Sequence, residues 1–220
     1  RGKASEFYGI GGSPKEAESS LVKRDCELAK EIGAKINIQH ISSAEAVELV
    51  RQAKAAGAKV YSEAAPHHFT LTEEACIKHG TLAKMNPPLR TEDDRLAIIK
   101  GLQDGTIDMI ATDHAPHSAE EKSKGLAGST FGVVGIETAF PVLYTHLVKT
   151  GVITLEKLIE LLSENARKRF DIPLGKSFTV WNLEKEFTVD PDEFLSMGKA
   201  TPFAGWKLFG ECVLTVCDGT

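Results

Sequence analysis

The chain has 220 residues, of which 42% are hydrophobic and 26% are charged, so it can bury a substantial core. Its formal charge of −5 excludes the basic footprint of a protein that binds nucleic acid. No apolar stretch is long enough to cross a bilayer and residue 1 does not begin a signal peptide, so we expect a cytoplasmic protein that stays off membranes. The four cysteines form no CxxC pair, which is typical of small core residues in a reducing compartment.

Helices and strands are predicted to alternate along most of the chain. Apolar spacing predicts a helix over 14–32, and a short β-branched strand follows at 34–40. Ser42 or Ser43 then caps a second helix, which Gly57 ends. The remaining elements are strands at 59–65, 82–86 and 108–113 and helices at 92–103, near 135–149 and near 154–163. Strands and helices in this order predict a parallel sheet and an α/β fold.

The number of strands narrows the fold class. The sequence predicts only four strand–helix units, whereas a complete (β/α)₈ barrel of the TIM type has eight in about 250 residues. The chain is therefore either an open sheet or half of such a barrel. No glycine-rich phosphate loop follows any strand, which argues against a nucleotide-binding open sheet. We therefore expect residues 1–170 to form the C-terminal half of a TIM-type barrel.

The pattern changes near residue 177. SFTVWNL and EFTVD predict two short strands, and KLFGECVLTVCDG predicts a hairpin around Gly210. We therefore expect residues 177–220 to form part of a small β appendage domain. The helix before this segment runs into the first strand with little room for a turn, which suggests that residues between Lys176 and Ser177 are missing from the chain.

Polar side chains stand at or near the ends of the predicted strands. They are His40, Glu63, Asn86 and Asp113. In (β/α)₈ barrels and in doubly wound sheets alike, the carboxyl ends of the strands carry the active site. The sequence therefore predicts a site at this edge of the sheet.

The segment IATDHAPHS (110–118) carries the strongest local signal. A carboxylate at a strand end can bind a metal, act as a general base, or do both. Alone, Asp113 would more often cap a turn, but two histidines follow it within five residues. Imidazole is the commonest zinc ligand, and His40 stands at another strand end. Together these residues favour a metal site over a structural turn.

Three other segments leave alternatives open. His67 and His68 follow a strand as neighbours, and they are either metal ligands or loop residues that form hydrogen bonds. Asn86 precedes two prolines, so it is either a substrate contact on a stiff loop or part of an ordinary turn. Phe131 and Gly132 lie on a loop before a helix, where they either approach a flat ligand or are a core Phe and a loop Gly.

Several segments together resemble the bacterial type I dihydroorotases, which are amidohydrolases. These segments are IQHISS, PHHFTLTEE, KMNPPLR, DGTIDMIATDHAPH and FGVVGIETAFPVLYTHLV, in this order. The resemblance covers most of the chain, from the first helix to TPFAGWKLFGE, and NPPLR together with ATDHAPH is quite specific. It implies a (β/α)₈ barrel with one or two zinc ions. It also implies reversible hydrolysis of L-dihydroorotate to N-carbamoyl-L-aspartate in de novo pyrimidine biosynthesis.

The resemblance also implies roles for individual residues. His40 resembles the zinc ligand at the end of barrel strand five. Asp113 resembles the strand-eight aspartate that binds zinc and serves as catalytic base and acid. The expected substrate contacts are Asn86, His117 and the backbone of Phe131 and Gly132. In this family the adjacent histidine pair is not usually counted among the ligands, which favours its structural interpretation.

The sequence departs from the family pattern in what it lacks. The His-x-His-x-Arg motif, the bridging acid and the strand-four histidine are absent, so the remaining zinc ligands are expected upstream of Arg1. Zinc sites usually take at least three protein ligands, and we expect the chain alone to be inactive. The alternatives are another cyclic amidase, such as a hydantoinase or an allantoinase, and a non-catalytic scaffold that partners aspartate transcarbamoylase. Beyond its small-molecule substrate, the expected partners are a second copy in a homodimer or that transcarbamoylase.

Overall fold

A parallel sheet of three short strands forms the centre of the computed structural model, which describes residues 2–218. The strands are β1 (Ile36–Ile38), β2 (Val60–Ala64) and β3 (Met109–Ile110), in this spatial order. β2 pairs in parallel with both of its neighbours, and helices connect consecutive strands. The predicted α/β fold with a parallel sheet is confirmed.

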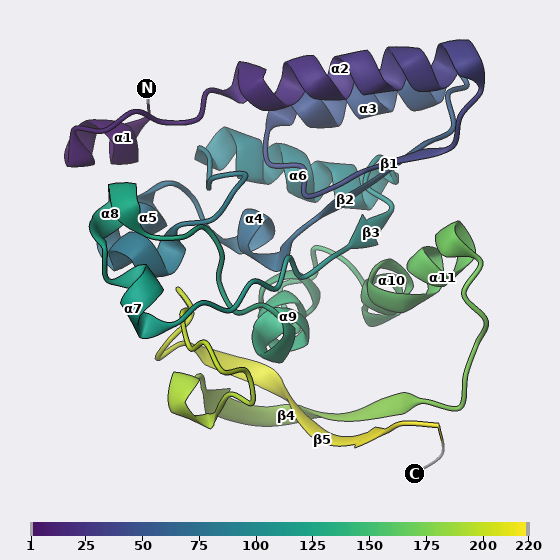
Figure 1. Ribbon diagram of the computed structural model, residues 1–220. Coiled ribbons are helices and arrows are strands. Elements are labelled where there is room, and N and C mark those ends of the chain that lie inside the picture. Colours follow the sequence, from purple (N-terminus) through teal and green to yellow (C-terminus); the bar gives the residue numbers. More distant parts are fainter. Residues whose placement is uncertain (1, 219–220) are drawn as a thin grey trace.

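Three long helices cover one face of this sheet (Figure 1). They are α2 (Lys15–Ile32), α3 (Ala44–Ala55) and α6 (Glu92–Asp104). Each begins and ends on local signals. α2 stops at a left-handed glycine, the Ser43 hydroxyl caps α3 by accepting from the Ala46 N–H, and Thr91 opens α6 in a capping box. The helices predicted at these places are confirmed.

The prediction of a strand at 82–86 is wrong. This part of the chain forms a 3₁₀ helix, η1 (Gly80–Ala83), followed by an extended loop that joins no sheet. The backbone of Lys84 is used elsewhere, because its N–H donates to the Thr81 carbonyl oxygen at 3.1 Å and its carbonyl oxygen accepts from the Gly132 N–H at 3.0 Å. With three parallel strands instead of four, β1 would be strand six of a barrel in which β3 is strand eight, and not strand five.

A two-stranded antiparallel ribbon forms the C-terminal part of the molecule (Figure 1). β4 (Phe178–Thr188) covers both short strands predicted there and contains an irregularity between Asn182 and Glu186. The predicted hairpin around Gly210 is wrong, because β5 (Lys207–Val216) runs straight through it. A Cβ on Gly210 would lie 3.0 Å from Phe140 Cε1, so the glycine serves close packing of β5 on α9 (Ile136–Leu143) and not a turn.

The ribbon shares its hydrophobic core with the α/β part. Trp181 of β4 stacks on Phe140 of α9 with ring centroids 4.1 Å apart. A buried cluster also joins Val133 and Val142 to Phe203 and Leu208. Because these contacts cross the predicted boundary near residue 177, the two parts pack against each other through apolar side chains.

The other elements are short. They are α1 (Lys3–Tyr8), α4 (Pro66–Thr70), α5 (Glu74–His79), α7 (Ala119–Lys122), α8 (Gly125–Gly128), the π-helical turns η2 (Tyr144–Val148) and η3 (Glu160–Glu164), α10 (Leu155–Ile159), α11 (Asn165–Phe170) and the 3₁₀ helix η4 (Pro191–Glu193). The helices predicted near 135–149 and 154–163 are thus present but interrupted. Within residues 2–218, no helix has the length and apolar character needed to span a membrane.

Candidate functional site

His40 and Asp113 both stand just beyond the end of a parallel strand, in an uncommon backbone conformation. His40 has φ 38° and Asp113 has φ 48°, which places both in the left-handed region. This region costs a residue with a side chain about 1–2 kcal/mol, although Asp and His tolerate it better than most. Such residues cluster at active sites. The backbone geometry just beyond β1 and β3 therefore supports a functional site at the edge of the sheet where the sequence predicts one.

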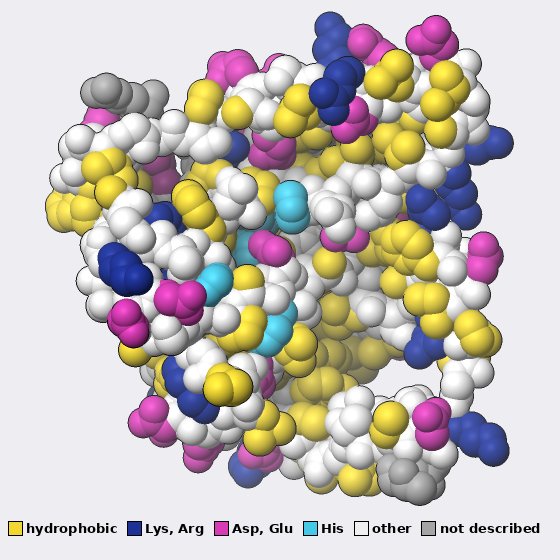
Figure 2. All heavy atoms as spheres, viewed as in Figure 1, with side chains coloured by type: hydrophobic (Ala, Val, Ile, Leu, Met, Phe, Trp, Pro, Cys, Tyr) yellow, Lys and Arg dark blue, Asp and Glu magenta, His cyan; other side chains and the backbone are white. Residues whose placement is uncertain are grey.

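The two residues share one neighbourhood with a third polar side chain, His67. Its Nε2 lies 3.9 Å from Asp113 Oδ2, and the His67 side chain is buried. Burial raises the pKa of Asp113, and the nearby His40 partly opposes this rise. The structure thus brings His40, His67 and Asp113 together, and Figure 2 shows histidines gathered beside an acidic group near the middle of this face.

His67 and His68 lie on the single helical turn α4, which begins just after β2 ends. Both are buried. His68 Nε2 donates to the Pro87 carbonyl oxygen at 3.2 Å, which fits the structural interpretation of that residue. His67 Nε2 is buried and has no hydrogen-bond partner among the described residues. His68 Nδ1 is likewise buried without such a partner, but it is the free nitrogen of His67 that lies 3.9 Å from Asp113.

Acid is expected to destabilise the protein because His68 is buried in its neutral form. Burial lowers the pKa of His68 from the ordinary 6.5 to about 4. A group with a lowered folded-state pKa contributes stability that is fully present above its unfolded pKa and is lost as pH falls towards the folded pKa. Between pH 6.5 and 4, His68 should thus cost the fold about 3 kcal/mol. Urea titrations across this range, with chelator present, measure the loss.

Two variants test whether His68 causes this acid sensitivity. His68→Gln keeps an N–H donor for Pro87 but does not titrate. The free energy of unfolding of this variant should therefore depend less steeply on pH, by the uptake of one proton. His79→Gln is the control, because the His79 side chain is only partly buried and should contribute less. If His68→Gln keeps the full pH dependence of the unaltered protein, His68 is not its source.

The loop that carries His40 is held by the carboxylate of Glu18 in α2. This carboxylate accepts from the backbone N–H of Ser42 at 2.9 Å and of Ser43 at 3.2 Å, and from both hydroxyls. Arg90 of the NPPLR loop lies beside it, with Nη2 3.3 Å from Glu18 Oε2 and Nε donating to Ser42 Oγ at 3.1 Å. The side chains of Glu18 and Arg90 are 12% and 8% exposed. This buried ion pair ties the loop after β1 to the NPPLR loop.

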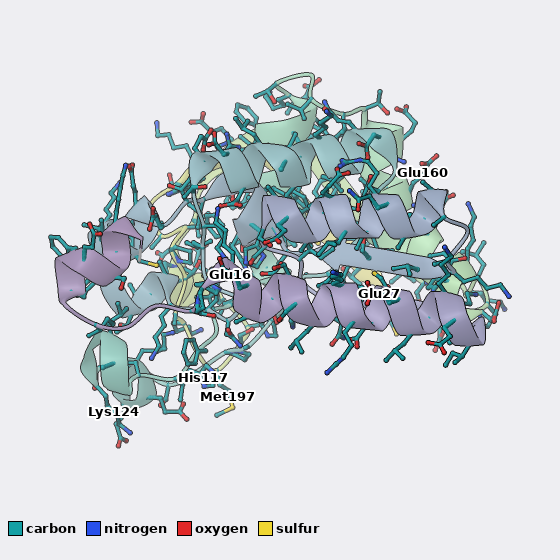
Figure 3. The ribbon with its side chains drawn as sticks, turned by 90° about the horizontal axis from the view of Figure 1, so that it is seen from above. Glu16, Glu27, His117, Lys124, Glu160 and Met197 are labelled. Carbon is teal, nitrogen blue, oxygen red and sulfur yellow. The ribbon has the colours of Figure 1, made fainter. Side chains whose placement is uncertain are left out.

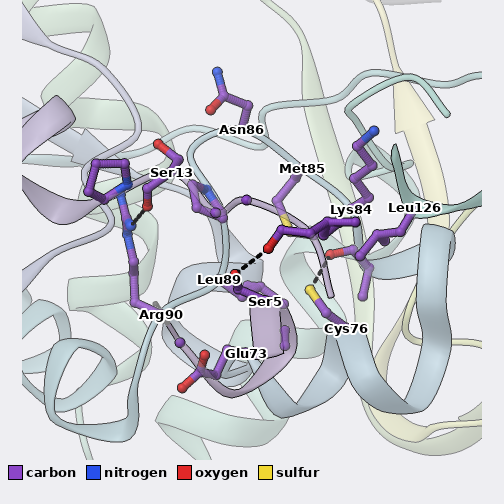
Figure 4. A pocket seen from close by; sticks show the side chains of 18 of the residues that line it. Ser5, Ser13, Glu73, Cys76, Lys84, Met85, Asn86, Leu89, Arg90 and Leu126 are labelled. Atoms are coloured by element: carbon purple, nitrogen blue, oxygen red, sulfur yellow. Dashed lines mark hydrogen bonds between the residues drawn. The ribbon is translucent and has the colours of Figure 1, made fainter. Parts of the chain in front are cut away.

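Asn86 is exposed at the rim of a cavity of about 870 Å³. The cavity lies between residues 10–16, the NPPLR loop and α8, and Phe131 also lines it. In Figure 4 the amide of Asn86 points away from the other labelled side chains. The peptide bond from Asn86 to Pro87 is cis. His40 and Asp113 do not line this cavity, so Asn86 and the candidate metal ligands fall in separate groups.

His117, Phe131 and Gly132 are brought into contact. His117 Nε2 donates to the Phe131 carbonyl oxygen at 2.8 Å. Gly132 has φ 128°, and a Cβ there would lie 2.5 Å from the Cβ of Ala115. Only glycine fits this position, because any side chain would collide with the loop that follows Asp113. The close backbone approach expected at Gly132 is thus made to the chain's own loop.

His114 has a structural role that the sequence did not reveal. Its Nδ1 accepts from the backbone N–H of Gly135 at 3.0 Å and of Ile136 at 3.3 Å, at the start of α9. Its Nε2 lies 3.4 Å from Ser196 Oγ, which donates to Glu137 Oε1 at 2.6 Å. His114 therefore links the loop after Asp113 to α9 and to the C-terminal segment.

A zinc site would be incomplete within these residues. His40, Asp113 and the unpartnered His67 nitrogen are donors of the types that zinc prefers. However, residues 2–218 contain no group of three or more His, Cys, Asp or Glu side chains placed to hold one metal ion. The donor chemistry fits zinc, and the number of donors falls short of a zinc site.

The chain is similar to curated dihydroorotases. It is 48% identical over 225 residues to the dihydroorotase of Geobacillus sp. (strain WCH70), which covers 99% of this chain and 53% of that protein. It is 49% identical over 226 residues to that of Brevibacillus brevis (strain 47), with the same two shares. The chain therefore spans about half the length of the curated relatives it matches.

Solved structures show the same fold. The L-hydantoinase (dihydropyrimidinase) of Arthrobacter aurescens matches with a TM-score of 0.89 at 30% identity, covering 94% of this chain and 49% of that chain. The dihydropyrimidinase of Brevibacillus agri NCHU1002 matches with a TM-score of 0.88 at 21% identity, covering 99% of this chain and 52% of that chain. A model of the Amidohydrolase family matches residues 6–219. The chain belongs to the amidohydrolase family.

Proposed function

We propose that this chain forms about half of a zinc-dependent dihydroorotase, which reversibly hydrolyses L-dihydroorotate to N-carbamoyl-L-aspartate in de novo pyrimidine biosynthesis. One observation carries the proposal. His40 and Asp113 lie near each other just beyond the strand ends, both in left-handed conformations, in a chain 48% identical to curated dihydroorotases. His40 and Asp113 would hold one or two zinc ions together with ligands from polypeptide outside these residues.

Asp113 is proposed as the catalytic base and acid. A bound zinc ion would supply Lewis acidity, which makes water nucleophilic near neutral pH. Asp113 takes a proton from the water that attacks the ring amide carbonyl and delivers it to the departing amide nitrogen. Burial raises the pKa of this carboxyl in the metal-free protein, and a zinc ion bound to it would oppose that rise.

The remaining site residues would bind and orient the substrate. The Asn86 side chain offers both a donor and an acceptor to an amide or a carboxylate. His117 is fixed by its hydrogen bond to the Phe131 carbonyl, so its ring keeps one direction. The Phe131 ring is exposed and can flank a flat substrate ring, and Gly132 keeps the backbone of that loop close to His117.

The proposal includes a finer description of the fold. Residues 1–170 would be part of a metal-dependent (β/α)₈ hydrolase barrel, from strand six to strand eight by the count above. Residues 177–220 would be part of the β appendage. A homodimer, an association with aspartate transcarbamoylase, a cytoplasmic location and a missing stretch between Lys176 and Ser177 stay predictions.

The test is turnover by the intact protein, with zinc measured on the same sample. We expect hydrolysis of L-dihydroorotate and the reverse reaction from N-carbamoyl-L-aspartate, and loss of both on chelation. Hydantoin and allantoin serve as competing substrates, because the likeness to an L-hydantoinase makes another cyclic amidase the second candidate. Turnover of either one without turnover of dihydroorotate would assign the protein to that candidate. No turnover of any of the three by zinc-loaded protein would favour a scaffold.

A further inference from the structure

Lys122 is a buried lysine whose ammonium group is bound by backbone carbonyl groups. It stands at the end of α7 and is 4% exposed. Its Nζ donates to the carbonyl oxygens of Lys84 at 3.2 Å, Thr130 at 3.1 Å and Gly132 at 2.8 Å. A lysine ammonium has three N–H donors. All three are therefore used within the protein.

Stability alone is a weak reason for a lysine at this place. Burial, together with the neighbouring Lys84, lowers the pKa of Lys122 to about 8, and no carboxylate among the described residues opposes them. A buried cation without an acidic partner costs free energy, which hydrogen bonds only partly offset. An apolar side chain of similar length would fill the same space without this cost. The ammonium group is therefore better explained by what it holds in place.

The three carbonyl groups belong to segments that carry the proposed substrate contacts. Lys84 lies two residues before Asn86, and the segment 130–132 contains Phe131. α7 itself begins two residues after His117. One ammonium group thus joins α7 and the nearby 130–132 segment to the loop around Lys84, which is 38 residues away in the sequence. Together these stretches would surround the substrate.

Lys84 adds to the same arrangement from the other side. Its carbonyl oxygen also accepts from the Gly132 N–H at 3.0 Å. Its own ammonium group donates to the Ser129 carbonyl oxygen and lies 4.3 Å from the centre of the Phe131 ring. It also lies 3.5 Å from the Ala127 carbonyl oxygen of α8. The 129–132 loop is therefore held by two lysines, of which only Lys122 reaches all three segments.

We propose that Lys122 is a positioning residue for the reaction. It fixes the spacing between Asn86, His117 and the backbone of the 130–132 segment, so that the substrate meets contacts that are already in place. Preorganised contacts bind more tightly because less conformational freedom is lost on binding. This inference rests on the proposed function.

The test is Lys122→Met in the intact protein, which keeps the apolar stem and removes the donors. KM for L-dihydroorotate should rise about tenfold with kcat unchanged, because contacts made equally in the ground and transition states affect binding alone. Hydrogen exchange of the backbone amides in 129–134 should become faster. Lys124→Met is the matched control, because Lys124 is exposed two residues away (Figure 3), and it should change neither quantity. Lys122→Arg keeps N–H donors at this position, so its KM should rise less than the KM of Lys122→Met.

The outcomes separate this inference from the proposed function. Unchanged KM and unchanged exchange in Lys122→Met would overturn the positioning role, as would a fall in kcat at constant KM. If Lys122→Met does not fold, Lys122→Gln takes its place, because its shorter, neutral side chain has two N–H donors and cannot serve all three carbonyl groups. A higher KM and faster exchange in 129–134 are expected for it too, and no change in either would overturn the positioning role. If the unaltered protein does not turn over dihydroorotate, the proposed function fails, and the exchange measurement alone decides whether Lys122 holds the loop.

Discussion

Asp113→Asn is expected to lower kcat for L-dihydroorotate by about 10²- to 10⁴-fold in the intact protein, which is the usual contribution of a positioned acid or base. Asn has the same size as Asp and also tolerates the left-handed backbone found at φ 48°. The loss would therefore report the carboxylate and not the backbone. Bound zinc should fall only in part, because His40 and the other ligands remain. Steady-state kinetics and zinc analysis on one sample measure both effects.

The same variant has a second readout in stability. Burial raises the pKa of Asp113 from its ordinary 3.8. A carboxyl with a raised folded-state pKa contributes stability that is present below its unfolded pKa and is lost as pH rises through the folded pKa. At neutral pH the ionised Asp113 thus destabilises the zinc-free protein, and Asn removes this cost. The free energy of unfolding should therefore rise while activity falls, as is common where a site is kept for function.

Asp171→Asn is the matched control. Asp171 is exposed at the end of α11 and has φ 54°, so it shares the residue type and the backbone region of Asp113. Neither its activity nor its stability should change appreciably. Near-normal turnover by Asp113→Asn would exclude Asp113 as the base and acid of the reaction.

The long helices could be predicted because local signals determine them. The strand at 82–86 and the hairpin at Gly210 were predicted wrongly because tertiary contacts determine the structure there. α2, α3 and α6 each carry a cap or a stop within a few residues of their ends, and these signals act without the rest of the fold. The segment 82–86 looked like a strand, but its backbone bonds to a 3₁₀ turn and to the loop at Gly132, which is far away in the sequence. Gly210 looked like a turn because nothing nearby in the sequence shows that Phe140 packs against it.

The site was predictable where strand ends determine it. His40 and Asp113 follow from strands that run in parallel to one edge. Which of two adjacent histidines faces Asp113 depends on where β2 stops and a helical turn begins, and this requires the structure. Lys122 lies in the charged run AEEKSK, which is typical of a solvated surface. Its burial comes from backbone groups up to 38 residues away, which no local pattern contains.

Glu18→Gln is expected to lower the free energy of unfolding of the intact protein by about 3–5 kcal/mol, the usual cost of removing one partner of a buried ion pair. The amide has one acceptor oxygen where the carboxylate had two. It cannot serve the donors of Ser42, Ser43 and Arg90 together, and the Arg90 charge stays buried without its counterion. The loop after β1 should loosen as well, so activity should fall with stability. Urea titration measures the first effect and steady-state kinetics the second.

Glu27→Gln separates burial from charge, because Glu27 lies on the same helix and forms an exposed pair with Lys23 at 3.9 Å (Figure 3). Loss of this exposed pair should lower the free energy of unfolding by at most about 1 kcal/mol. A second comparison isolates the ion pair. If the stranded Arg90 charge causes most of the loss, then Arg90→Met in the Glu18→Gln background should restore part of the stability, since adjacent partners do not act additively. Equal costs for Glu18→Gln and Glu27→Gln would mean that the pair does not hold the loop after β1.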